Sequence, residues 1–139
     1  MKLPNKELRA FIYNRLLNSI TVGSVIPVCS VPAKTQDFPF IDLGNISIIE
    51  NLSTKDAYIT RCQIEINVYT QFADENTSYT QCEEISSAIT ERLINFKGDT
   101  TNFNIDWARF ISSNEVFEQT ETVKAISNTI IVEYLCEQI

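Results

Sequence analysis

Adjacent carboxylates come nearest to a catalytic arrangement in this sequence. Such pairs could serve as a general acid and a general base. Three of them occur: Asp74 with Glu75, Glu83 with Glu84, and Glu118 near Glu121. Each pair falls on the surface of a predicted helix or in a predicted loop, where charged side chains normally face water. We therefore interpret all three as solvated surface charges.

The cysteines offer a second kind of chemistry. Cys82 lies near the start of a predicted helix, whose dipole could activate a thiolate. It also shares the apolar stripe of that helix, and this position favours burial. The spacing contains no CxxC pattern and no histidine that would complete a zinc site. In a reducing cytoplasm we expect free thiols that pack as small apolar groups: Cys29, Cys62, Cys82 and Cys136.

Histidine is absent, which limits the possible reactions more than any other feature. Its absence removes Ser-His-Asp and Cys-His nucleophile activation, histidine-ligated metals and the commonest general base at neutral pH. The glycines, Gly23, Gly44 and Gly98, lie too far apart to form a phosphate-binding loop. The sequence therefore predicts no catalytic residues, no cofactor and no metal site, and we expect the protein not to be an enzyme.

The length and the net charge of the chain limit its possible domain organisation and partners. A chain of 139 residues is predicted to form a single domain, residues 1–139, with a core of its own. The formal net charge of −7 argues against wrapping nucleic acid, which requires clustered lysine and arginine. No apolar run approaches the ~20 residues of a membrane span, and the first residues do not resemble a secretory signal. We expect the protein to remain in the cytoplasm where it is made.

The first half of the chain predicts one helix followed by three strands. Residues 5–18 carry apolar side chains at helical spacing. A short strand over residues 25–31 contains Pro27, which indicates an edge or bulged position. Further strands are predicted over 40–49 and 58–69, and the second of these alternates strictly between apolar and polar residues.

The second half predicts a helix over residues 78–95, then strands over 103–112 and 123–136. Trp107 is predicted to share the apolar face of the first of these strands. Together the elements indicate an α+β fold: a mostly antiparallel sheet of four to five strands with two helices packed on one face.

The stretch DFPFIDLGN, residues 37–45, leads from a loop into the second strand. Pro39 has no N–H group and biases Phe38 toward an extended backbone, which suits the entry to a strand. Alternation then predicts Phe40 and Asp42 on one face of the sheet and their neighbours on the other.

Several segments in this order resemble the tail-completion, or tail-terminator, proteins of tailed bacteriophages. The marks are the DFPF step with its following glycine (Phe38, Pro39, Phe40 and Gly44), the loop beginning STKD, the strand TRCQIEINVYT, the helix run EEISSAITERL and an Ile- and Val-rich closing strand. Members of this family are small α+β proteins that form a ring between head and tail.

The resemblance implies a structural virion protein at the head–tail junction, assembled in the cytoplasm of a host bacterium. Its partners would be further copies of itself, in a hexameric or dodecameric ring, together with portal, neck and tail proteins. DNA would pass through as cargo, and neither a membrane nor a small-molecule substrate would be involved. Residues in predicted loops or near them are candidates to contact these partners: Glu50, Lys55, Asp56, Phe72, Asp74, Glu75, Tyr79 and Glu118.

Two alternatives stay open from the sequence. One is a different head–tail ring protein, an adaptor or a stopper. The other belongs to another class, a small cytoplasmic α+β domain that binds or senses a ligand. The second would need a concave pocket with converging polar groups.

Overall fold

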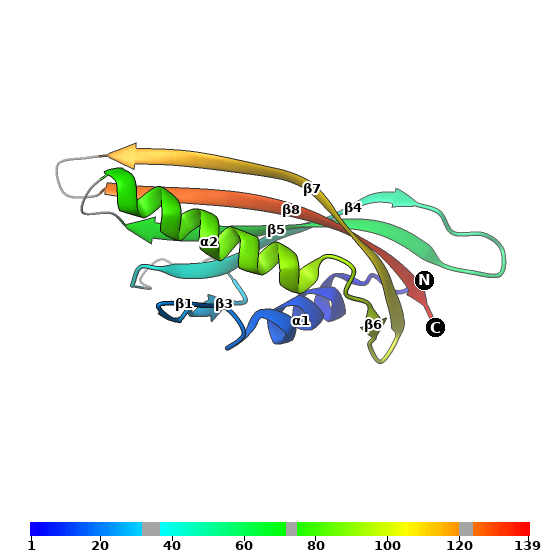
Figure 1. The fold of residues 1–139 in the computed structure, drawn as a ribbon. Helices are drawn as coiled ribbons and strands as arrows, with labels where there is room; N and C mark the ends of the chain where they lie inside the picture. Colours follow the sequence, from blue (N-terminus) through cyan, green and yellow to red (C-terminus); the bar gives the residue numbers. More distant parts are fainter. Residues whose placement is uncertain (32–36, 72–74, 120–123) are drawn as a thin grey trace.

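A computed structural model describes residues 1–31, 37–71, 75–119 and 124–139 of the chain. Two helices, α1 (Asn5–Leu16) and α2 (Glu75–Leu93), lie against one mixed sheet (Figure 1). The six strands of this sheet run in the order β3-β4-β5-β8-β7-β6. The expected α+β class is confirmed.

The strands differ greatly in length. β3 (Val28–Cys29) pairs in parallel with β4 (Phe40–Asn51), and all other neighbours in the large sheet are antiparallel. The remaining bounds are β1 Thr21–Val22, β2 Ser24–Val25, β5 Ile59–Gln71, β6 Gly98–Asp99, β7 Phe103–Gln119 and β8 Lys124–Gln138. β1 and β2 form a separate two-stranded hairpin around Gly23, whose φ of 76° suits a glycine.

The expected count of four to five strands in a mostly antiparallel sheet needs correction, since the sheet has six strands and one parallel pair. The predicted strand 25–31 is divided at Pro27. Proline cannot donate to a ladder, and its carbonyl instead accepts the Ile41 N–H at 2.9 Å. The residues before Pro27 therefore join the hairpin, while those after it start the parallel edge strand.

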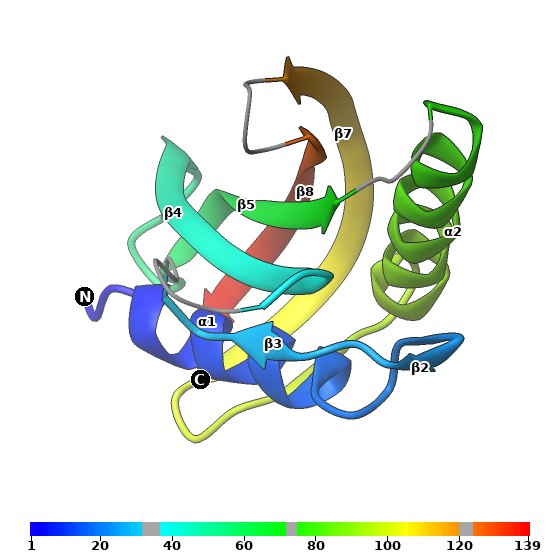
Figure 2. The same ribbon diagram turned by 90° about the vertical axis from the view of Figure 1, so that its left-hand side faces the viewer.

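β7 is the second departure from expectation. It runs to Gln119, beyond residue 112 where the predicted strand ends, and it pairs with β8 as far as Gln119 opposite Lys124. A register shift between Asp106 and Arg109 places Trp107 at a positive φ of 61° and leaves it 43% exposed, outside the core where the alternation predicted it. Figure 2 shows the strong curl of the sheet between β4 and β7.

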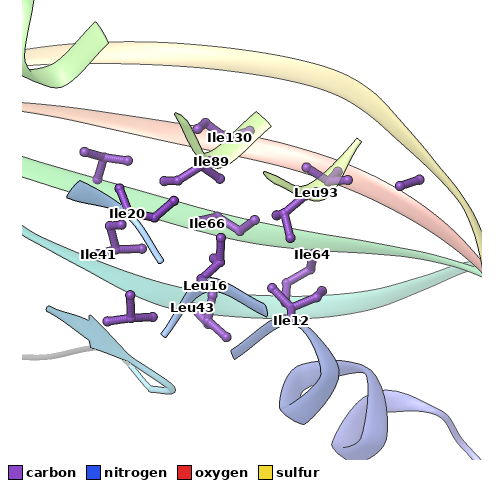
Figure 3. Close-up of a cluster of buried hydrophobic side chains, with 14 of the residues drawn as sticks. Ile12, Leu16, Ile20, Ile41, Leu43, Ile64, Ile66, Ile89, Leu93 and Ile130 are labelled. Carbon is purple, nitrogen blue, oxygen red and sulfur yellow. The ribbon is translucent and has the colours of Figure 1, made fainter. Parts of the chain in front are cut away.

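The core lies between the helices and the inner face of the sheet. Ile64 and Ile66 of β5 are fully buried, as the alternation predicts. Both helices contribute their apolar stripes to the same cluster (Figure 3). The buried helix residues are Leu8, Ile12 and Leu16 of α1 and Cys82, Ile85, Ile89 and Leu93 of α2. This arrangement confirms that the two helices cover one face.

We predict that Ile66→Ala lowers the free energy of unfolding by about 2–5 kcal/mol, because it opens a cavity where both helices meet the sheet. The matched control is Ile49→Ala, whose side chain is exposed on β4, and its effect should stay within about 0.5 kcal/mol. Urea denaturation monitored by circular dichroism measures both values. Equal losses in the two variants would contradict this description of the core.

Candidate functional site

The DFPF step forms a row of aromatic rings on the outer face of the sheet, opposite the helices. The ring centroids of Phe38 and Phe40 lie 5.6 Å apart, and Phe40 stacks on Tyr69 at 4.7 Å. Phe40 and Asp42 share this outer face while Ile41 and Leu43 enter the core, as predicted. The rings hold the start of β4 against β5, which is a scaffolding role.

Polar side chains continue this anchoring along β4. Asn67 donates to Asp42 at 2.9 Å, and Thr129 donates to Asn67 at 2.9 Å, so the chain of hydrogen bonds links β4, β5 and β8. A Cβ at Gly44 would lie 3.0 Å from Glu65 Oε2 and 3.1 Å from Asn67 Nδ2. A larger residue at position 44 would therefore crowd this network.

A buried carboxylate lies further along the outer face. The side chain of Glu133 on β8 is only 2% exposed. Arg109 Nη2 lies 2.9 Å from Glu133 Oε2, and Arg61 Nε lies 3.3 Å from Glu133 Oε1. Arg61 also reaches Glu50 at 2.7 Å, although that carboxylate is 45% exposed. The two arginines compensate the buried charge and connect the outer strands to β8.

β7 offers a long edge of the main sheet. β6 pairs only with Asn104 and Ile105, and among the described residues no strand continues along the rest of that edge. We define the β7 edge as residues 110–119. Every side chain from Ser112 to Gln119 is exposed. The β7 edge contains no lysine or proline, the residues that commonly protect such edges, and its only charges are Glu115 and Glu118.

A second edge of the main sheet belongs to β4. β3 covers only Ile41 and Asp42, and Arg9 of α1 bonds the carbonyls of Leu43 and Gly44 at 3.3 and 2.8 Å. Beyond them, residues 47–51, defined here as the β4 edge, have no strand on that side within the described part of the chain. Ile48 and Ile49 are exposed there. The two edges lie on opposite sides of the sheet and differ in length and sequence.

The candidate partner residues divide between two ends of the molecule (Figure 1). Lys55 and Asp56 are exposed in the loop after β4, while Glu50, predicted in that loop, belongs to β4 itself. At the other end, Tyr79 is exposed on α2, and Glu118 lies on β7 rather than in a loop. Phe72 and Asp74 lie outside the described residues, and Glu75 is the first residue of α2.

Sequence reasoning missed the exposed apolar residues of β7, namely Phe110, Val116 and Phe117. Their signal is weak because the surrounding residues are polar and do not alternate. Only the pairing of β7 with β8 shows that these three residues lie along the edge of one strand.

Among the three carboxylate pairs, the structure describes both members of only one. Glu83 and Glu84 are exposed on the outward side of α2, and the other two pairs each include a residue outside the described ranges. No group of three or more potential metal ligands occurs among the described residues. Likewise, none of the described helices is long and apolar enough to cross a membrane.

Three of the four cysteines are buried in the core, and Cys29 on β3 is partly exposed. Cys82 is fully buried, as its apolar stripe predicts. Burial, with a smaller contribution from Glu115, raises the pKa of Cys82 to about 11. Such a thiol stays protonated at neutral pH, so the activated-nucleophile interpretation does not hold. Cys62 and Cys136 are buried on adjacent strands, and a hydrogen bond between the two thiols together with burial raises the pKa of Cys136.

These features define an α+β protein with two helices on one face of a curled mixed sheet. The sequence matches no protein-family model and no curated protein. Solved structures do share the fold. One is a chain of the structure described as "Virion of native gene transfer agent (GTA) particle", with a TM-score of 0.73 and 16% identity over 94% of each chain. At that identity the likeness establishes the fold.

We predict that the stability of the protein falls between pH 9 and pH 11 in part through Cys82, whose pKa rises from 9.0 to about 11 on folding. In this range the unfolded chain loses the thiol proton and the folded chain keeps it, so rising pH favours unfolding. The contribution is about 2–3 kcal/mol at most. Cys82→Ala should show a shallower decline in urea titrations under reducing conditions. Parallel declines would contradict the assignment.

We also predict that Arg61 couples more strongly to Glu133 than to Glu50, despite its shorter distance to Glu50. Burial reduces screening at Glu133, whereas Glu50 is largely solvated. Double-mutant cycles with Arg61→Met, Glu133→Gln and Glu50→Gln should give about 1–3 kcal/mol for the first pair and less than about 1 kcal/mol for the second. The reverse order would show that distance outweighs burial here.

Proposed function

We propose that this protein is a structural component of a phage-like virion and forms a ring at the head–tail junction, in the manner of a tail terminator. The fold likeness to a chain of a gene transfer agent virion, which extends over 94% of both chains, supports a structural role in such a particle. The order of sequence segments that resembles tail-completion proteins supports the finer assignment.

The observation that carries the proposal is the presence of two unlike edges of the main sheet, the β7 edge and the β4 edge, along which the described residues form no further strand. An edge strand with free backbone groups and exposed apolar side chains is suited to pairing with another chain. When the two edges differ, contact between copies is heterologous, and repeated rotation of such a contact closes into a ring.

The charge of the protein fits this role. A formal net charge of −7 would repel phosphates rather than retain them, so DNA would pass through the ring as cargo. The remaining partners in this proposal are portal or neck proteins on one side of the ring and tail proteins on the other. The proposed role is structural and involves no catalysis.

An adaptor or stopper ring would use the same kind of subunit. Immunogold labelling of particles that contain the protein would separate these roles, because a terminator lies against the tail tube and an adaptor lies against the portal. Label on the portal side would favour the adaptor.

We predict that the purified protein forms cyclic oligomers whose population grows with concentration. Sedimentation velocity and negative-stain electron microscopy measure this directly. Val116→Lys should weaken assembly, because it places a charge on the β7 edge where apolar contact is expected. Val25→Lys on β2 is the matched control, since both valines are 50% exposed, and it should assemble like the wild type.

A wild-type protein that stays monomeric at every concentration would contradict the ring proposal. Equal assembly of the two lysine variants and the wild type would instead exclude the β7 edge from the contact.

A further inference from the structure

A cavity of about 530 Å³ lies between α1, α2 and the residues around β6. Its lining includes Arg15 of α1, Arg92 near the end of α2, and the rings of Phe11 and Phe96. It thus combines two guanidinium groups with an aromatic wall, a composition that none of the roles described above uses.

The two guanidinium groups are held in place by reciprocal hydrogen bonds. Arg15 Nε donates to the carbonyl of Arg92 at 3.0 Å, and Arg92 Nε donates to the carbonyl of Arg15 at 3.1 Å. Arg92 Nη2 also donates to Ser19 Oγ at 3.3 Å. The Arg15 guanidinium lies 3.7 Å from the centroid of Phe96, which stacks on Phe11 at 5.2 Å. Both positive charges are therefore oriented before any ligand arrives.

Neither guanidinium group forms an ion pair with another described residue. Among the described residues, no carboxylate lies within ion-pair distance of either guanidinium. Glu7 and Asp99 line the same cavity, and the two oxygens of Glu7 accept hydrogen bonds from Asn102 at 2.9 and 3.1 Å. Burial and the neighbouring Arg92 charge lower the pKa of the Arg15 guanidinium. Two guanidinium groups that lie beyond ion-pair distance of any described carboxylate make a site that a further carboxylate would stabilise.

The same chain carries a suitable carboxylate row. Glu83, Glu84 and Glu91 are exposed on α2, with Ile85 and Ile89 buried on the opposite side of the helix. They line one shallow hollow on the outward surface of α2. Because this row faces away from the core and Arg15 lies on the inner flank between the helices, a subunit cannot place its own row in its own cavity.

We propose that the Arg15–Arg92 cavity is the socket for a glutamate from the outward face of α2 in a second copy of this chain. The inference rests on the proposed ring, and it names a contact within that ring. Charge complementarity favours a glutamate as the occupant. In an acidic chain, carboxylates are the charged groups that a neighbouring copy presents most often. Socket and row are different surfaces, so the contact is heterologous, as ring closure requires.

Charge reversal tests the contact. Arg15→Glu changes the socket, and Glu84→Arg with Glu91→Arg changes the row. Each variant alone should weaken subunit association ~30-fold or more in sedimentation equilibrium, because it sets like charges against one another. A chain that carries all three substitutions should recover much of the association. Lys6→Glu, an exposed lysine on α1, and Glu137→Lys, an exposed glutamate on β8, are matched controls and should associate normally.

Circular dichroism establishes that each variant is folded. If Arg15→Glu unfolds, the row variant decides the question, because its substitutions are fully on the surface. If the wild type and every variant all form the ring, the proposed socket contact is wrong, and the ring proposal is unaffected. A wild type that never associates would overturn both.

A small anion is the other possible occupant of the Arg15–Arg92 cavity. Inorganic phosphate is the probe for it. Stabilisation of the wild type by millimolar phosphate, lost in Arg15→Gln, together with normal assembly of the row variant, would assign the cavity to a small anion and overturn the socket.

Discussion

The pairing of β5 with β8 is the interaction on which the rest of the structure depends. Every residue of β5 from Ile59 to Gln71 has a partner on β8, and the ladder contains no bulge. The unbroken register places Ile64 and Ile66 beside Val132 and Ile130 on one face, which both helices then cover. A slip of one residue would turn these side chains outward and bury their polar neighbours, so the helices and the strand pair specify each other.

The outer strands depart from this regularity, and the proposed interaction surfaces arise there. β4 changes register twice beyond Leu43, and β7 changes register twice between Asp106 and Ser112. Each shift bends its strand and increases the local twist. Beyond these shifts both strands carry exposed apolar side chains, among them Ile49 and Val116, although they belong to long strands of the main sheet.

The arginines are mostly used to hold this arrangement together. Arg9 bonds backbone carbonyls of β4, and Arg61 and Arg109 compensate Glu133 on β8. These three arginine side chains make their contacts within the subunit, and the chain has a formal net charge of −7. Arg15 and Arg92 also bond carbonyls and a hydroxyl, and they differ from Arg9 in that their two guanidinium groups line one cavity. On an acidic chain, a cavity in which Arg15 and Arg92 have no described carboxylate within ion-pair distance would give neighbouring copies a preferred orientation of contact.

The local sequence determined the core of this protein. The alternation around Ile64 and the helical stripes through Ile12 and Ile89 predicted the α+β class, the covered face and the burial of Cys82, because side-chain periodicity depends only on local backbone geometry. The strand order, the extent of β7 and the exposure of Trp107 depended on pairing with β8. Arg15 and Arg92 lie 77 positions apart, and only tertiary packing brings them together. The candidate surfaces follow from that packing, since edges and charge pairs are properties of neighbours in space.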